Sequence, residues 1–261
     1  MIKADVFSYQ KGNSPVVMSF PHDGMLLPPE IKKHFNTLGQ QVPDTDWFVN
    51  QLYSFLAELD VSFFIPDYSR YVVDLNRSSQ GGSLYPGQYE TSVCPVATFD
   101  DVSIYNAGCE PNGDEIQRRI TAYWQPYHDH IRSELERVKA LHGYAILWDA
   151  HSIRGVVPQL FAGVLPELNF GTAAGTSCAL DILKRVTDIA HAQNDFSVVE
   201  NARFKGGFIT RHYGNPADNI HTIQLEINQS IYMSDEQPAA LDDEKCARLR
   251  PLLKQFITAL I

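Results

Sequence analysis

Short apolar runs that alternate with longer amphipathic segments are the feature that most restricts the fold of this chain. Each run is rich in β-branched or aromatic residues, as strands that are covered on both faces are. We expect strands at Val16–Phe20, Ser62–Ile65, Tyr71–Leu75, Tyr144–Trp148, Phe208–Thr210 and Ile223–Ile227. Strands that alternate with helices predict a three-layer α/β/α fold with a mixed, mostly parallel sheet.

Four longer segments carry apolar residues at helical spacing and predict helices at about 45–56, 115–141, 179–192 and 242–260. Thr45 suits the N-cap of the first, and Gly143 suits the position just after the second. Pro126 should kink or split that second helix. Residues 76–114 are rich in Gly, Ser, Pro and Tyr and predict long loops. We expect a single domain over residues 1–261, since no repeat or linker divides the chain.

Composition excludes several classes of protein. A net charge of -10 disfavours nucleic acid as a partner, because phosphate binding needs a basic surface. There is no apolar stretch of 18 residues or more, and the first residues have no apolar core, so we expect no membrane span and no secretory signal. The four cysteines form no CxxC pair, which favours reduced thiols and a cytoplasmic protein over a disulfide scaffold.

Polar side chains stand at the carboxyl ends of most of the predicted strands, where open α/β sheets place their chemistry. His22 follows the first strand in Pro-His-Asp-Gly, and His151 follows the fourth in Asp-Ala-His-Ser. Neutral imidazole is a good zinc ligand, so we interpret both histidines as metal ligands. Asp149 is placed to accept the second ring N–H of a histidine. The alternative is that both are ordinary hydrogen-bonded histidines at loop starts.

A carboxylate would complete a three-ligand set and leave a fourth position for water, as catalytic zinc requires. Asp46, expected in the first turn of the helix after Pro43, is our choice for this ligand. An acidic residue there would also favour the helix dipole without any function. Asp23 and Glu30 are the alternatives.

Glu226 lies in an otherwise apolar segment, where a carboxylate is costly unless it is paired or functional. Beside a bound metal it could take a proton from water and pass it to a leaving amine. The alternative is an edge strand in which Gln224, Glu226 and Asn228 form a solvated face.

An acidic protein that binds an anion needs local cations. Arg77 follows a predicted strand and Asn76, and its guanidinium could hold a substrate carboxylate bidentately. Arg154 and Arg211 are similar candidates. Each of these arginines could instead form a surface ion pair, an alternative that fits Arg77 least because it stands right after a strand and before a Gly-rich loop.

Five segments together resemble the N-formylglutamate amidohydrolase family: Ser-Phe-Pro-His-Asp-Gly at 19–24, Val-Asp-Leu-Asn-Arg at 73–77, Trp-Asp-Ala-His-Ser at 148–152, the segment at 206–214, and Gln-Leu-Glu-Ile-Asn at 224–228. The resemblance implies a zinc-peptidase-like fold and one zinc ion per chain. It implies hydrolysis of N-formyl-L-glutamate to glutamate and formate, late in histidine degradation. The wider group implies that Asn76 and Arg77 bind the substrate carboxylate. The expected partner is thus a small acidic N-acyl amino acid, and the expected state is a monomer or weak homo-oligomer.

One departure from the wider group concerns the metal ligands. That group often uses His-x-x-Glu, whereas Met25 stands three residues after His22, so the carboxylate ligand cannot be copied from the pattern. A related zinc deacylase or carboxypeptidase, and a non-catalytic ligand-binding protein of the same fold, remain alternatives. A serine hydrolase is disfavoured because the chain has no GxSxG elbow.

Overall fold

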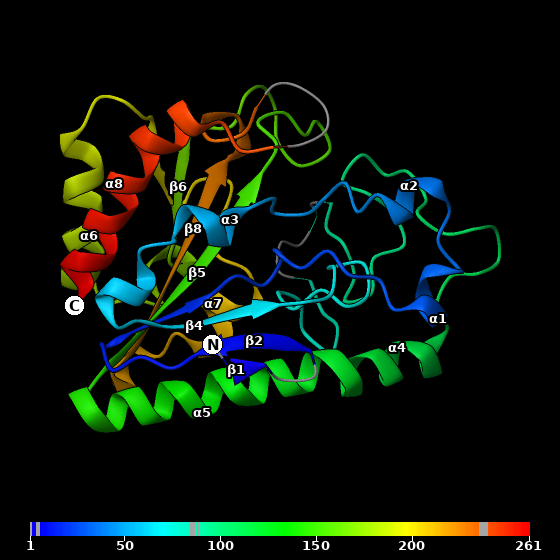
Figure 1. Cartoon of the computed structure of the whole chain (residues 1–261), viewed down its shortest axis with the longest axis horizontal. Helices are drawn as coiled ribbons and strands as arrows, with labels where there is room; N and C mark the ends of the chain where they lie inside the picture. The colour runs from blue at the N-terminus through cyan, green and yellow to red at the C-terminus, as the bar shows by residue number, and fades with distance from the viewer. Residues whose placement is uncertain (1, 4–5, 84–86, 88, 235–239) are drawn as a thin grey trace.

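In the computed structural model, eight strands form one mixed sheet in the order β1-β2-β4-β3-β5-β8-β6-β7 (Figure 1). Residues 2–3, 6–83, 87, 89–234 and 240–261 are described. The strands are β1 (Ile2–Lys3), β2 (Phe7–Gln10), β3 (Val16–Ser19), β4 (Ser62–Pro66), β5 (Ala145–Ile153), β6 (Leu168–Gly171), β7 (Val198–Glu200) and β8 (Ile220–Asn228). The four central strands, β4, β3, β5 and β8, are parallel, while β2 and β6 pair antiparallel on either side of them. The predicted mixed, mostly parallel sheet is confirmed.

The helices are α1 (Pro29–Lys32), α2 (Thr37–Gln40), α3 (Val49–Leu52), α4 (Gly113–Arg119), α5 (Gln125–His142), α6 (Leu180–Ala192), α7 (Phe208–Tyr213) and α8 (Asp243–Leu260). A π-helical turn, η2 (Ile120–Trp124), joins α4 to α5, and short 3-10 turns lie at Leu56–Leu59, Ala173–Gly175, Pro216–Asp218 and Gln229–Ile231. Of the helices that the structure describes, none combines the length and apolarity needed to cross a bilayer.

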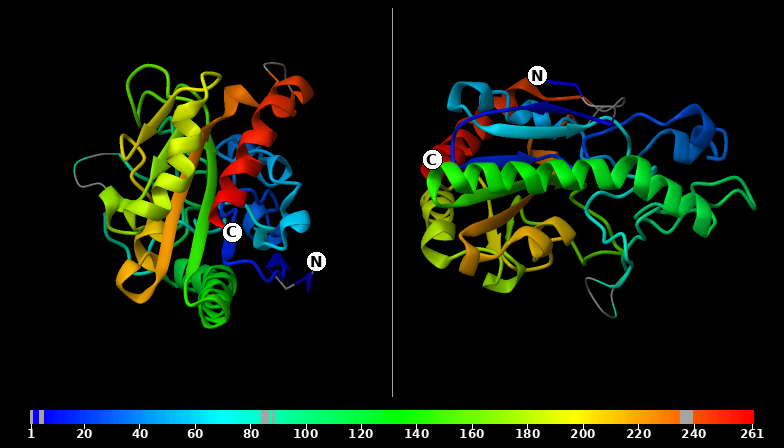
Figure 2. Two further views of the ribbon diagram at one scale, coloured as in Figure 1. Left: turned by 90° about the vertical axis from the view of Figure 1, so that its left-hand side faces the viewer. Right: turned by 90° about the horizontal axis from the view of Figure 1, so that it is seen from below.

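Helices cover both faces of the sheet. Alternate residues of the central strands point to opposite sides, so Val16 and Met18 pack with α3, α6 and α8, whereas Val17 packs with α5 and α7. Figure 2 shows α4, η2 and α5 as one long rod along one side of the sheet, with α6 and α8 on the other. This arrangement is the three-layer α/β/α fold predicted from the alternation of strands and helices.

The long helices follow their sequence signals. Asp242 caps α8 by accepting a hydrogen bond from the Lys245 backbone N–H. Gly143 ends α5 with a φ of 79°, the left-handed conformation that glycine adopts most readily. Pro126 lacks a backbone N–H, and the α-helix is interrupted by the η2 turn just before it.

Three predicted elements are wrong. The run at Tyr71–Leu75 is buried but irregular: the Asp74 N–H donates to the Val93 carbonyl of a neighbouring loop rather than to a strand. Residues Phe208–Thr210 begin the helix α7. The helix expected at 45–56 shrinks to α3 and a 3-10 turn, because Phe48 adopts a left-handed φ of 60° just before it. Short apolar runs do not distinguish these states.

The carboxyl ends of β4, β3, β5 and β8 meet at one edge of the sheet, as the ends of adjacent parallel strands must. Loops that carry α1 and α2 extend beyond that edge and form the right-hand side of Figure 1. A separate small core holds these loops together, and its buried members are Ile31, Phe35, Val42, Tyr71, Val72, Ile104 and Tyr105. The described residues from 76 to 112 contain no helix or strand, in agreement with the predicted loops.

Candidate metal-binding active site

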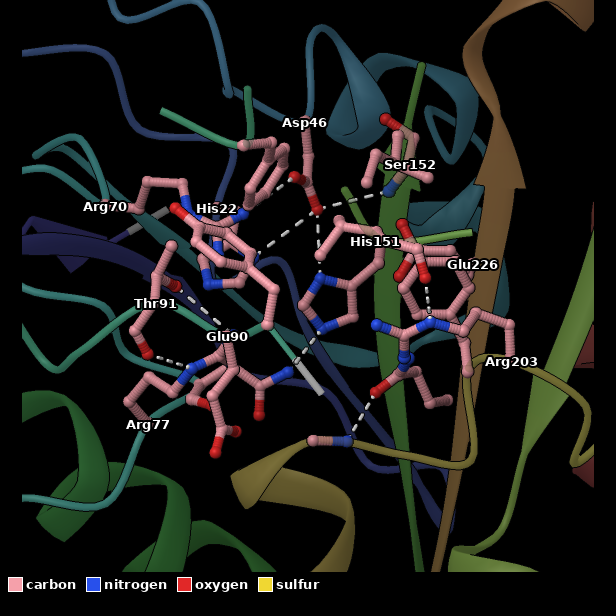
Figure 3. A pocket seen from close by; sticks show the side chains of 18 residues that line it. His22, Asp46, Arg70, Arg77, Glu90, Thr91, His151, Ser152, Arg203 and Glu226 are labelled. Atoms are coloured by element: carbon pink, nitrogen blue, oxygen red, sulfur yellow. Dashed lines mark hydrogen bonds and ion pairs between the residues drawn. The ribbon is translucent and has the colours of Figure 1, made fainter. Parts of the chain in front are cut away.

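Two histidines and one aspartate converge at this edge of the sheet. His22 follows β3, His151 lies inside β5, and Asp46 lies in the irregular segment before α3. One ligand atom from each lies within 4.8 Å of the others, and all three residues are buried. Asp46 Oδ2 is 2.9 Å from His151 Nδ1 and 3.6 Å from His22 Nδ1 (Figure 3). The predicted trio is therefore a group that could bind a metal.

Backbone contacts hold Asp46 in this position although it lies outside the helix where it was expected. Its N–H donates to the His22 carbonyl at 3.1 Å, and its Oδ2 accepts from the Ser152 N–H at 3.1 Å. The two alternative carboxylates lie elsewhere. Asp23 accepts a hydrogen bond from the Asn50 N–H, and Glu30 is exposed on α1.

Two further aspartates orient the histidine rings. Asp149 Oδ2 lies 3.2 Å from His151 Nε2, in the outer position expected of it. Asp74 Oδ1 lies 2.7 Å from His22 Nε2 and has the equivalent position, which sequence reasoning did not assign. With each Nε2 beside a carboxylate, both Nδ1 atoms face Asp46. Asp74 could have been found by the signal that singled out Glu226, a carboxylate within a buried apolar run.

The electrostatics of this group favour a cation. Burial opposes the charged form of His151, but Asp149 and Asp46 outweigh it and raise its pKa well above the ordinary value. Burial also opposes charge on Asp74, yet Arg70 and His22 hold its pKa well below the usual range. The surroundings of His151 thus favour a positive charge on its ring. A metal ion is also positive and could take the place of the proton. The donor set of two imidazoles and one carboxylate fits zinc.

A cavity of about 620 Å³, its mouth included, opens beside the trio. Glu226 lines it from β8, where it stands directly opposite His151 of β5. Burial raises the pKa of Glu226 to about 8, and Asp46 acts in the same direction. Since β8 lies inside the sheet and all its residues are buried, the edge-strand alternative for Glu226 is wrong.

Asn76 both lines the cavity and supports the trio, because its Nδ2 lies 3.0 Å from His151 Nε2. Arg77 lines the cavity next to it. Its guanidinium is held by hydrogen bonds to the Thr91 carbonyl and hydroxyl and to the Asn76 carbonyl.

The two other predicted arginines do not line this cavity. Arg154 is partly exposed and pairs with Asp100 at 3.0 Å. Arg211 is exposed on α7 and donates from Nε to the Gly206 carbonyl. Both were candidates for a cation that binds the substrate carboxylate, but a residue's position along the chain does not set the direction of its side chain.

Two arginines that the sequence did not single out line the cavity instead. Arg70 follows β4 and is buried, with Nη2 2.6 Å from Asp74 Oδ2 and Nη1 3.8 Å from Asp46 Oδ1. Arg203 comes from the segment between β7 and α7. Arg70 follows an apolar strand and could have been found by that rule, whereas no sequence pattern marks Arg203.

The fold and this site define an α/β protein in which a buried group of two histidines and one carboxylate, a group that could bind a metal, lines a cavity. A family model described as N-formylglutamate amidohydrolase matches residues 14–233. The chain belongs to this family, and the predicted resemblance is confirmed.

Individual relatives match almost the whole length of this chain. A protein named N-formylglutamate deformylase from Pseudomonas putida is 40% identical over 256 residues, covering 98% of this chain and 96% of the relative. Its namesake from Pseudomonas aeruginosa is 41% identical over 257 residues, with the same coverage. The crystal structure of N-formylglutamate amidohydrolase from Ralstonia eutropha has a TM-score of 0.81 at 19% identity, covering 98% of this chain and 96% of that one. A gene product from Agrobacterium tumefaciens gives 0.73 at 17% identity, covering 98% and 95%. These structures support the fold alone.

Proposed function

We propose that this chain hydrolyses the amide bond of N-formyl-L-glutamate, releasing formate and L-glutamate, with a zinc ion held by His22, Asp46 and His151. The observation that carries the proposal is the juxtaposition of this buried trio with Glu226 in a cavity lined by arginines. The names of the relatives from Pseudomonas support the substrate. The donor chemistry supports zinc.

Zinc bound there would supply Lewis acidity, which polarises a carbonyl and makes water more acidic. The residues of the chain transfer the proton and position the substrate. Glu226 takes a proton from the attacking water and later gives it to the leaving nitrogen as the C–N bond breaks. A pKa raised to about 8 by burial makes this carboxyl able to hold a proton and release it again near neutral pH.

Arg70 adds a fixed positive charge to the wall of the cavity. Its pairs with Asp74 and Asp46 hold it in place, so it does not need to reorganise when negative charge develops on the amide oxygen. Arg77 binds the carboxylate next to the scissile amide. Three of its five N–H groups are held by Thr91 and Asn76, which fixes the plane of the guanidinium before substrate arrives.

The test begins with the metal content of purified protein. Formate release is then measured from N-formyl-L-glutamate with and without a chelator, with N-acetylglutamate and N-formylaspartate as comparison substrates. We expect stoichiometric zinc and formate release that the chelator abolishes. Zinc without formate would contradict the substrate and favour a related deacylase or carboxypeptidase. Failure to bind zinc on reconstitution would contradict the metal site and favour a non-catalytic role.

Asp46→Ala tests the third ligand directly, because removing one of three ligands should leave less than stoichiometric zinc. Asp188→Ala is the matched control, an exposed aspartate on α6. Full zinc content in Asp46→Ala would mean that another carboxylate holds the metal.

We also place the reaction in the cytoplasm. The four cysteines are unpaired, and three of them are buried, which suits a reducing compartment.

A further inference from the structure

Three arginines line the cavity, and they come from different parts of the chain. Arg70 pairs with Asp74 and Asp46. It therefore helps to hold the candidate metal-binding group, which is the trio of His22, Asp46 and His151. Arg77 and Arg203 come from separate segments, one in the turn that follows Asp74 and the other between β7 and α7. Figure 3 shows them on different sides of the cavity.

The cavity is otherwise acidic. Glu90 and Glu226 line it together with Asp46, and the whole chain carries a net charge of -10. An anionic ligand therefore needs a local cation for each carboxylate that it brings out of water, because an unpaired buried carboxylate is costly. A dicarboxylate needs two such cations, and one guanidinium binds only one carboxylate bidentately.

We propose that Arg203 binds the side-chain carboxylate of the substrate, while Arg77 binds the carboxylate on the carbon that carries the scissile nitrogen. This inference rests on the proposed function. The α-carboxylate must lie close to the metal-binding group, and Arg77 follows Asp74 and Asn76, which contact the two histidines. Arg203 then binds the other end of the substrate, where the side-chain carboxylate distinguishes glutamate from neutral amino acids.

The surroundings of Arg203 suit this role. Its Nε donates to the Leu160 carbonyl, and its guanidinium carbon lies 5.4 Å from the centre of the Phe204 ring. These two contacts orient the guanidinium before a ligand binds and lower the conformational entropy lost on binding. They also connect the segment that holds Arg203 to the segment that holds Leu160. A substitution of Arg203 can therefore act through the packing of these segments, and the experiment must separate that effect from the loss of carboxylate binding.

The experiment compares zinc-reconstituted wild-type protein with Arg203→Met on two substrates. N-formyl-L-glutamate carries the side-chain carboxylate, and N-formyl-L-glutamine replaces it with an uncharged amide of similar shape. We expect Arg203→Met to lower kcat/KM for the glutamate derivative by about 10- to 100-fold, as loss of a charge-assisted pair does. We expect less than about a threefold change for the glutamine derivative, so the ratio between the two substrates collapses.

Two further variants sharpen the result. Lys205→Met removes the same charge from an exposed position on the same segment and should leave both values unchanged. Arg77→Met should lower both values together, because both substrates carry the α-carboxylate.

Equal losses on both substrates in Arg203→Met, or no loss on either, would overturn the assignment of Arg203 alone. A wild-type protein that releases no formate from N-formyl-L-glutamate would instead overturn the proposed function, and with it this inference, before any variant is made.

Discussion

Glu226 illustrates how a single residue can serve function at the expense of stability. Its carboxyl is buried in a strand whose nine residues are all buried, and that burial raises its pKa to about 8. The ordinary value for glutamate is about 4.3. The carboxyl therefore loses its proton at a much lower pH in the unfolded chain than in the folded protein. Folding stability from this group is therefore lost progressively as pH rises from about 4.3 to about 8.

Glu226→Gln should separate the two roles. The variant cannot accept a proton, so we expect formate release to fall by about 10²- to 10⁴-fold. It also removes the cost of ionising the buried carboxyl, so the metal-free variant should be more stable than metal-free wild type at pH 9, by a few kcal/mol. The gain should shrink towards pH 5. Denaturant unfolding at the two pH values measures it, and a variant that is less stable at pH 9 would contradict this account.

Asp74 and Asp149 support one histidine each but differ in what else they touch. Asp74 also pairs with the buried Arg70, whereas one carboxylate oxygen of Asp149 has no hydrogen-bond partner among the residues that the structure describes. Replacing either by asparagine should weaken zinc binding by about 10- to 100-fold. Asp74→Asn should in addition destabilise the protein by about 1–3 kcal/mol, because the buried Arg70 loses its charged partner at 2.6 Å and keeps only the 3.8 Å pair with Asp46.

Zinc titration and thermal unfolding of both variants test this contrast, with the exposed Asp181→Asn as control. Unchanged zinc affinity in both variants would show that the Nε2 contacts do not tune the ligands.

At the residue scale, the sequence pointed to polar groups at apolar runs that the structure brings together. His22 and His151 follow such runs and Glu226 interrupts one, and all three line one cavity. Asp74 carries the same signal, but it was taken as part of a motif and not as a site residue. Arg203 could not be predicted, because its place in the cavity depends on how a loop folds against another loop.

At the scale of elements, the start of α7 is fitted closely against the turn that holds Asn76. A Cβ added to Gly207 would lie 2.4 Å from Asn76 Nδ2. Asn76 cannot easily move, because its Oδ1 accepts from the Ile209 N–H and its Nδ2 contacts His151. The absence of a side chain at Gly207 therefore lets α7 support the metal-binding group.

Gly207→Ala should push Asn76 away and disturb His151. We expect a stability loss of about 1–3 kcal/mol, typical of overpacking, together with weaker zinc binding. The control is Gly113→Ala at the start of α4, where an added Cβ meets nothing within 4 Å and alanine is the better helix former. Thermal unfolding and zinc titration of both variants give the answer, and equal behaviour of the two would contradict it.

The elements themselves were predictable to the extent that their signals are local. The helices α6 and α8 were predicted closely, because their amphipathic patterns are long and, in α8, Asp242 marks the start. The runs at Tyr71–Leu75 and Phe208–Thr210 are short, and tertiary contacts decide their state. The strands β1, β2, β6 and β7 were missed, because they are short strands in the outer part of the sheet with weak apolar patterns.

At the scale of the whole molecule, the metal-binding group joins segments that are far apart in the chain. His22 follows β3, Asp46 belongs to the loops that cover the sheet edge, and His151 lies in the central strand β5. An ion bound there would link the covering loops to the sheet. Because the unfolded chain does not assemble the three ligands, zinc should stabilise the folded protein by an amount that grows with its concentration.

This stabilisation should depend on pH with a predictable sign. Without metal, Asp149 and Asp46 overcome burial and raise the pKa of His151 well above the ordinary 6.5. The proton on His151 therefore stabilises the metal-free fold fully below about pH 6.5, and this contribution is lost as pH rises through the raised pKa. Zinc must displace that proton, so below the raised pKa its apparent affinity should increase about tenfold per pH unit.

As pH rises, the metal-free fold loses stability while the apparent zinc affinity increases, so the two contributions change in opposite directions. Thermal unfolding of chelator-treated and zinc-loaded protein at pH 6 and pH 8 should show a larger zinc-induced rise in Tm at pH 8. Each tenfold gain in affinity adds about 1.4 kcal/mol at saturating zinc. His191→Ala, an exposed histidine at the end of α6, should leave the pattern unchanged. A rise in Tm that is equal at both pH values would mean that His151 carries no proton for zinc to displace at pH 6, and would contradict the raised pKa on which this prediction depends.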